Sequence, residues 1–169
     1  MRWRHTYRDF AVVELERYNQ SEYFEGCAVV AIQFHPEQGT ILVCDFKGFV
    51  APEMIKRRPV VVVSPRLRKR DGLCTVVPLS TTPPREVAAY HFKLHVAPVL
   101  PEPYNADFHW VKADMVYTVS FDRLSLPFCG KDLGGKRIYD VRVIDKADLL
   151  KIQQCLLHGL GLASLTDYL

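Results

Sequence analysis

The sequence predicts an α+β protein that is mainly β, a small barrel of short antiparallel strands with one helix at its C-terminal end. Short apolar or alternating runs recur between turn residues from residue 40 onward, at the length of strands rather than helices. A clear amphipathic helical spacing follows only after Asp145. A chain of 169 residues has the size of one domain with a real hydrophobic core.

The predicted strands follow one another closely along the chain. Two of them are rich in β-branched residues, and the first of these begins at Pro59, where a missing N–H costs little. Asp71-Gly72 supplies the turn that joins this pair. The predicted strand regions are 40–46, 59–64, 73–79, 88–96, 110–126 (one or two strands) and 138–143, with a Gly-containing turn at 131–136.

Residues 88–96 alternate between apolar and polar side chains, as a half-buried strand does. The apolar face carries Tyr90, Phe92, Leu94 and Val96. The polar face carries His91, Lys93 and His95.

The C-terminal helix is predicted from its cap and its spacing. Asp145 is a good N-cap residue, because its carboxylate can accept a hydrogen bond from a free N–H of the first turn. The predicted apolar face is Leu149, Ile152, Leu156 and Leu160.

Residues 1–30 differ in character from the rest and show only a weak helical pattern, at 9–18. We predict an N-terminal appendage with helical tendency over residues 1–30, followed by one domain over 31–169. The alternative is a helix that docks on the core through Phe10, Val13 and Tyr18.

Positive charge is concentrated in one stretch of the chain. The net charge of +3 is only mildly basic, so the position of the charges matters more than their total. No acidic residue lies between Glu53 and Asp71, an interval that holds seven Lys and Arg residues. Cations at the ends of rigid strands indicate a phosphate-binding surface.

The five cysteines indicate a reducing environment. Their number is odd, and no CxxC or CxxH pair suggests zinc. No apolar run approaches the roughly 18 residues of a membrane span, and the N-terminus has no apolar core of a secretory signal. We therefore predict a cytoplasmic protein with reduced, mostly buried thiols, no metal and no membrane partner.

Several motifs together resemble the MazF/PemK family of toxin ribonucleases. They are GTILVCDF, a loop with Glu53 five residues before Arg58, RRPVVVVSP and VVPLSTT. The later VKADMVYTVSFDRL and the C-terminal helix fit the family in order and spacing. The resemblance covers roughly residues 36–165, and residues 1–30 lie outside it.

The resemblance implies an SH3-like, strongly twisted antiparallel barrel that works as a homodimer. It implies an mRNA interferase of a type II toxin–antitoxin module, which cuts single-stranded RNA at short sequences without a metal or cofactor. The 2′-hydroxyl of the substrate would be the nucleophile, and the products would be a 2′,3′-cyclic phosphate and a 5′-hydroxyl. A cognate antitoxin would inhibit by occupying the RNA groove.

Three positions match the family's catalytic positions. Arg58 stands immediately before the Pro-Val run, and Ser80 stands two residues after the proline of the second strand, where the family usually has threonine. Glu53 matches a loop acid found in some members. The candidate RNA-binding residues are Lys56, Arg57, Arg66, Arg68, Lys69, Arg70, Thr81, Thr82 and Lys93.

The chemistry of these side chains suits RNA cleavage by a 2′-hydroxyl. Arg58 can stabilise the phosphorane charge through paired hydrogen bonds, although its high pKa makes it a poor proton donor. Ser80 can hydrogen-bond a non-bridging phosphate oxygen, and Glu53 can take the proton. Structural alternatives are a surface cation, a strand-end cap and a solvated loop acid that pairs with Arg57.

His91 and His95 offer a second mechanism, because two imidazoles on one strand face are capable acid–base groups. Lys93 would then hold a phosphate, and Tyr104 and Trp110 could stack on bases. The alternative is an ordinary exposed strand face, with both aromatic side chains in the core. Arg66, Arg68, Lys69 and Arg70 form the longest cationic cluster, either an RNA contact or a solvated hairpin tip.

Two other functions are compatible with the same fold. One is a CcdB-like topoisomerase poison, and the other is a catalytically inactive binding module. The presence of both Arg58 and Ser80 favours the nuclease, since a poison does not need that pair.

Overall fold

The structure is a computed structural model that describes residues 31–66 and 69–169. The predictions for residues 1–30 and for Arg68 therefore lie outside the described residues. The strands are β1 (Ile41–Cys44), β2 (Arg58–Val62), β3 (Leu73–Ser80), β4 (His91–His95), β5 (Phe108–Lys112), β6 (Tyr117–Ser120), β7 (Leu124–Ser125), β8 (Phe128–Lys131) and β9 (Arg137–Tyr139). The helices are η1 (Phe121–Arg123), α2 (Lys146–Gly159) and η2 (Ala163–Tyr168).

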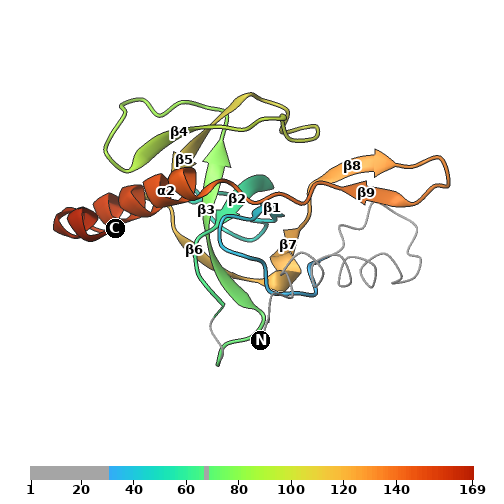
Figure 1. Cartoon of the computed structure of the whole chain (residues 1–169), viewed down its shortest axis with the longest axis horizontal. Coiled ribbons are helices and arrows are strands. Elements are labelled where there is room, and N and C mark those ends of the chain that lie inside the picture. Colours follow the sequence, from blue (N-terminus) through green and yellow to red (C-terminus); the bar gives the residue numbers. More distant parts are fainter. Residues whose placement is uncertain (1–30, 67–68) are drawn as a thin grey trace, which may run out of the picture.

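An antiparallel sheet forms the body of the molecule (Figure 1). Its strands pair in the order β4-β5-β3-β2-β1-β7, and β6 also pairs with β3. This confirms the mainly β fold with a C-terminal helix. Within the described residues the pairing path has free ends at β4 and β7, so the barrel is better described as a twisted open sheet.

Strand β3 organises the sheet because it pairs with three other strands. Leu73–Val76 pair with β6, and Leu79 and Ser80 pair with β5. Pro78 lies between these two ladders, so its missing N–H falls where β3 changes partner on that edge. A proline is therefore tolerated in the longest strand of the sheet.

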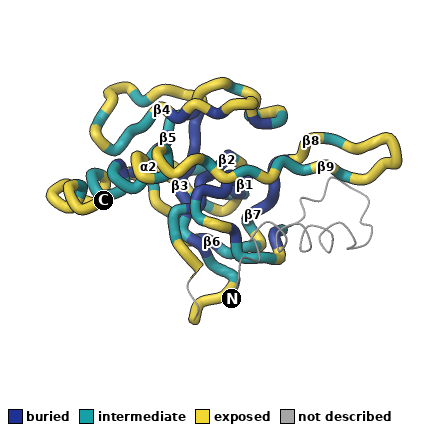
Figure 2. Tube along the Cα trace, in the orientation of Figure 1, coloured by how far each residue is buried: buried dark blue, intermediate teal, exposed yellow. Residues whose placement is uncertain are grey.

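The core consists of two apolar clusters that share the central strands (Figure 2). Alternate residues of β2 point to opposite sides, so Val60 and Val62 belong to the first cluster and Val61 to the second. Helix α2 covers the second cluster with Ile152 and Cys155. All the residues named here are buried.

Helix α2 begins as predicted, because the Asp145 side chain accepts a hydrogen bond from the Asp148 N–H at 2.8 Å. Its buried face is shifted from the prediction. Leu160, expected on that face, is the C-cap residue and is 63% exposed, whereas Cys155 is buried. The helix ends at Gly159, one residue before the last residue of the apolar pattern, and the chain then folds back as η2.

Other differences concern the second half of the chain. The region 110–126 contains β6 and β7 and most of β5, with η1 between β6 and β7. The sequence did not predict β8, which pairs only with β9 as a hairpin that projects from the body (Figure 1). This hairpin exposes its apolar side chains, so no burial pattern distinguishes it from a loop.

The described cysteines agree with the prediction of reduced thiols. Cys44, Cys74 and Cys155 are buried and free, whereas Cys129 is exposed and free. Burial raises the pKa of Cys44 and that of Cys74 to about 12. Within residues 31–66 and 69–169, no helix reaches the length and apolar character needed to cross a bilayer.

Candidate active site

Arg58 and Ser80 lie at the same end of the β2–β3 pair. Arg58 is the first residue of β2, and Ser80 is the last residue of β3. The register pairs Val60 with Pro78, so its continuation by two residues leads to Arg58 and Ser80. Strand alternation places Arg58 on the side of Val60 and Ser80 on the side of Val76, which belong to the same cluster. The structure therefore brings these two predicted residues to one side of the sheet.

Ser80 is held in place by its surroundings. It is only 5% exposed, and its backbone pairs with Trp110 of β5. Its Oγ accepts a hydrogen bond from the Thr82 N–H at 3.2 Å. The hydroxyl proton remains free for a phosphate oxygen, because this bond uses only a lone pair. Thr81 and Thr82 follow in the exposed loop after the strand.

The guanidinium of Arg58 is partly buried, and its Nε has no hydrogen-bond partner among the described residues. A buried donor without an acceptor costs about 1–3 kcal/mol. Unsatisfied groups of this kind call for an explanation, and a ligand that supplies the acceptor is one. A phosphate would fit this donor.

Lys112, for which the sequence predicts no role, ends β5 on the same side of the sheet. It lies two residues from Trp110 along the strand, so both side chains share one face. Burial lowers the pKa of Lys112, and the charge of Arg58 lowers it further, while Asp114 opposes both effects. A lysine that senses Arg58 and has a lowered pKa is a candidate for proton transfer.

Tyr104 lies in the loop before β5 and interacts electrostatically with the start of β2. Burial raises the pKa of its phenol, Arg57 and Arg58 lower it, and Asp45 raises it. Its ring packs against the second apolar cluster, which agrees with the core alternative for this residue.

Glu53 is exposed and closes its own loop. Its Oε2 accepts a hydrogen bond from the Val50 N–H at 2.7 Å, and its backbone N–H donates to the Val50 carbonyl. No ion pair joins it to Arg57 or Arg58 within the described part of the chain. The structure therefore gives Glu53 a local role and does not bring it against Arg58.

The three polar residues of β4 lie on the same face as the residues described above. The β4–β5 register pairs His91 with Lys112, Lys93 with Trp110 and His95 with Phe108. Because Trp110 also pairs with Ser80, the polar face predicted for β4 continues to the end of β3. The two rival sets of catalytic residues thus lie on one surface.

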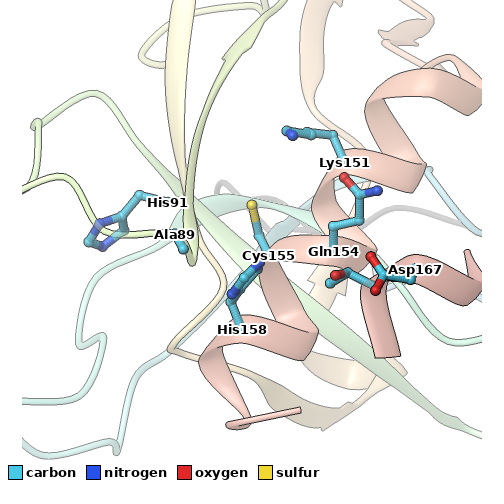
Figure 3. Close-up of a pocket in the computed structure, with 8 residues that line it drawn as sticks. Ala89, His91, Lys151, Gln154, Cys155, His158 and Asp167 are labelled. Atoms are coloured by element: carbon cyan, nitrogen blue, oxygen red, sulfur yellow. The ribbon is translucent and has the colours of Figure 1, made fainter. Parts of the chain in front are cut away.

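His91 has the character of a neutral, positioned imidazole. Its Nδ1 accepts a hydrogen bond from the Ala88 N–H at 3.2 Å, so its proton belongs on Nε2, which lies 3.8 Å from the Asp114 carboxylate. Burial lowers the pKa of His91, as does Lys112, and Asp114 partly offsets both. The ring points away from helix α2 (Figure 3).

The cations around the two ends of the β2–β3 hairpin are separated. Lys56 and Arg57 are exposed immediately before Arg58. Arg66, Lys69 and Arg70 lie at the other end, beyond a strand that is roughly 13 Å long at about 3.3 Å per residue. In Figure 1 this tip lies at the bottom of the view, and β4 and β5 lie at the top. The structure does not bring the longest cationic cluster to Arg58.

A pocket of about 420 Å³ lies between the start of β4, helix α2 and η2 (Figure 3). It is lined by Ala89, His91, Lys151, Gln154, Cys155, His158, Thr166 and Asp167. Arg58, Ser80 and Lys112 are not among its lining residues. Among the described residues, no group of three His, Cys, Asp or Glu side chains is arranged to hold a metal ion.

Comparison with known proteins identifies the family of the chain. Residues 37–159 match the family model of the PemK-like, MazF-like toxin of type II toxin-antitoxin systems. The chain belongs to the PemK/MazF-like toxin family. Escherichia coli (strain K12) YifN is 32% identical over 115 residues, which cover 57% of this chain and 76% of YifN. An uncharacterized Haemophilus influenzae protein is 26% identical over 147 residues, which cover 80% of this chain and 96% of that protein.

Two solved structures show the same fold as this PemK/MazF-like chain. One is a mycobacterial endoribonuclease in complex with its cognate antitoxin, with a TM-score of 0.51 and 23% identity. The match covers 76% of this chain and 97% of that one. The other is Deinococcus radiodurans MazF, with a TM-score of 0.50 and 19% identity over 76% of this chain and 99% of that one.

Proposed function

We propose that this PemK/MazF-like protein is a sequence-specific endoribonuclease that cuts single-stranded RNA through the 2′-hydroxyl of its substrate. The observation that supports the proposal best is the register that carries Arg58 and Ser80 to one side of the sheet, with Lys112 on the neighbouring strand. These side chains supply a fixed cation, a hydroxyl and an amine. The family membership supports the same reaction.

The reaction is an in-line transesterification. The 2′-hydroxyl loses its proton to a base, and its oxygen attacks the adjacent phosphorus while the bond to the 5′-oxygen breaks. The leaving 5′-oxygen takes a proton from water, so the products are a 2′,3′-cyclic phosphate and a 5′-hydroxyl. Arg58 stabilises the charge on the non-bridging oxygens, and Ser80 donates a hydrogen bond to one of them.

The proton acceptor in this proposal is Lys112 rather than Glu53. The Glu53 carboxylate is exposed and hydrogen-bonded within its own loop. An arginine guanidinium is too strong a base to be available in its neutral form as a proton acceptor. The amine of Lys112 has a lowered pKa and is sensitive to the charge of Arg58, which suits a group that takes a proton beside the phosphate.

We also propose that the protein acts in the cytoplasm as a homodimer that a cognate antitoxin inhibits. The mycobacterial endoribonuclease that shares the fold was solved with its own antitoxin. An antitoxin segment that covers the face of Arg58 and Ser80 would exclude RNA from it.

The test is incubation of the purified protein with a long RNA in the presence of EDTA, followed by analysis of the new ends. Cleavage that leaves 5′-hydroxyl ends supports the proposal, and mapping of the cut sites gives the recognised sequence. Absence of cleavage together with inhibition of gyrase indicates a topoisomerase poison. Absence of both activities indicates a binding module without catalysis.

A further inference from the structure

Six side chains form a continuous band across β4 and β5, which we name the β4–β5 stripe. Its members are His91, Lys93, His95, Phe108, Trp110 and Lys112, which are three cross-strand pairs on one face. At about 3.4 Å per residue, the stripe is roughly 14 Å long. It contains two lysines, two histidines and two aromatic rings, and no acidic residue.

Phe108 is the most unusual member of the stripe. It is 44% exposed, although it lies in a regular strand whose opposite face is buried. The Lys93 Nζ lies 4.4 Å from the centroid of its ring, and the His95 ring lies 4.9 Å away. The ring therefore lies against a lysine and an imidazole instead of being covered by apolar side chains.

The acidic groups near the stripe lie at its two ends. Asp114 lies beside His91 at one end, and Asp148 of α2 interacts electrostatically with His95 at the other. Lys93 and Trp110 form the middle pair, and the Lys93 ammonium also lies over the Phe108 ring. An exposed aromatic ring beside a lysine matches the surfaces that bind single-stranded nucleic acid, where bases stack and phosphates pair.

The stripe is continuous with the candidate active site. Trp110 pairs with Lys93 on one side and with Ser80 on the other. A strand of RNA whose scissile phosphate lies at Arg58 and Ser80 would therefore pass onto the stripe on leaving the site. No such continuity exists for the cations of the β2–β3 tip, which lie at the far end of the hairpin.

We propose that the β4–β5 stripe is a subsite for the single-stranded RNA that flanks the cleaved phosphate. Phe108 stacks on a base, and Lys93 binds a neighbouring phosphate. This inference rests on the proposed nuclease function, since it concerns the same substrate. The inference adds a surface that binds the RNA. It also assigns a binding role to Phe108 and Lys93, which take no part in bond cleavage.

The test measures binding separately from cleavage. The probe is a short, fluorescent single-stranded RNA of mixed sequence with 2′-O-methyl riboses, which cannot react through a 2′-hydroxyl. Phe108→Ala should weaken its binding about tenfold, because a stacked base contributes about that factor. Lys93→Ala should reduce the slope of log affinity against log salt by about 0.7, the value for one phosphate contact on a single strand.

Matched controls come from the β8–β9 hairpin. Phe128 is 48% exposed and contacts Tyr139, so Phe128→Ala removes a similar exposed ring from a strand outside the stripe. Lys136 is an exposed lysine in the turn of the same hairpin, and Lys136→Ala is the control for Lys93. Both controls should bind the probe as the unchanged protein does. Thermal melts establish that all four variants fold.

The outcomes separate this inference from the proposed function. Weaker binding for the stripe variants alone supports the subsite, even if the unchanged protein cuts no RNA. Equal effects for Phe108→Ala and Phe128→Ala, or no effect for either, overturn the subsite while cleavage of ordinary RNA still supports the nuclease. Failure of the unchanged protein to bind the probe also overturns it.

Discussion

At the scale of single residues, substitution of Arg58 should have the largest effect on the rate of RNA cleavage. We expect Arg58→Ala to lower the cleavage rate by roughly 10²–10³-fold, because it removes the fixed cation at the phosphate. Arg58→Lys should also lose most activity, since an ammonium cannot reproduce a two-pronged guanidinium contact. Single-turnover cleavage measures the rate. An unchanged rate in a folded variant would remove Arg58 from the site.

Ser80 provides a second residue-scale prediction. Ser80→Ala should slow cleavage about 10- to 100-fold through the loss of one hydrogen bond to a charged oxygen. It also leaves the Thr82 N–H without its acceptor. Ser80→Thr should stay within a few-fold of the unchanged protein, because it keeps the hydroxyl. Normal cleavage by Ser80→Ala would transfer the role to Thr81 or Thr82.

Lys112 predicts a pH dependence with a definite sign. An amine accepts a proton only when neutral, so cleavage should rise as the pH approaches the lowered pKa of Lys112 from below. Lys112→Met and Lys112→Arg should both lose this rise, since neither side chain can act as the base. The pH–rate profiles of the three proteins give the answer. A Lys112→Arg profile that matches the original would reduce Lys112 to a phosphate-binding cation.

The lowered pKa of Lys112 also affects the free energy of unfolding. A lysine whose folded-state pKa is lowered destabilises the folded state while it is protonated, and this cost falls as the pH rises through that pKa. Lys112→Met should therefore have a higher free energy of unfolding than the unchanged protein at neutral pH. The difference should shrink in alkaline solution, which denaturant titrations at several pH values would measure.

The sequence predicted Arg58 and Ser80 as candidates but not Lys112, for a physical reason. The motifs around Arg58 and Ser80 resemble a known family, and strand alternation places both residues on one side of the sheet. A lysine on a strand has no such sequence motif, and the residues that lie next to it depend on which strand pairs with its own. Only the register that pairs β5 with β3 and β4 shows that Lys112 shares a surface with Arg58.

At the scale of elements, helix α2 makes an unusually close approach to the sheet. A Cβ on Gly159 would lie 2.8 Å from the Ala113 carbonyl oxygen and 3.2 Å from its carbon, both of them backbone atoms. Replacement of a helical glycine by alanine normally stabilises a protein by about 0.5–1 kcal/mol. Here we expect Gly159→Ala to destabilise by about 1–3 kcal/mol, the range typical of overpacking.

A thermal melt tests this prediction, with Gly134→Ala as the control. Gly134 lies in the β8–β9 turn, and its added Cβ would meet only the Oδ1 atom of Asp132, at 3.3 Å, and no backbone atom. The melting temperature of Gly159→Ala should fall by about 2–4 °C per kcal/mol, while that of Gly134→Ala should change little. A stabilised Gly159→Ala protein would show that the helix can shift freely.

Element prediction from the sequence succeeded where a pattern coincides with burial. Strands β2 and β3 are almost wholly buried, and their apolar runs predicted them within a residue or two. Strand β4 followed from its alternation, although it begins at His91 rather than at residue 88. The β8–β9 hairpin was missed because its strands are largely exposed, so its sequence resembles a loop.

At the scale of the whole molecule, the first described residues already pack on the core. Ile32 is buried, and its N–H donates to the Leu124 carbonyl at 2.9 Å. Phe34 packs against the first apolar cluster, and His35 contacts Phe121 edge to face at 5.7 Å. The match to the family model begins shortly afterwards, at residue 37. Any shortened chain must therefore retain Ile32 and Phe34.

We predict that a chain starting at Ala31 folds, dimerises and cleaves RNA like the full chain. Most of the folding free energy comes from buried apolar area, and residues 31–66 and 69–169 already contain two apolar clusters that share one sheet. The competing hypothesis is that Phe10, Val13 and Tyr18 cover apolar surface of the domain. Their loss would then lower the melting temperature by about 2–4 °C for each kcal/mol of lost stability. It would also expose a patch prone to aggregation. Thermal melts and size-exclusion chromatography of both chains decide between the two, and a large fall in melting temperature or an aggregated short chain would contradict our prediction.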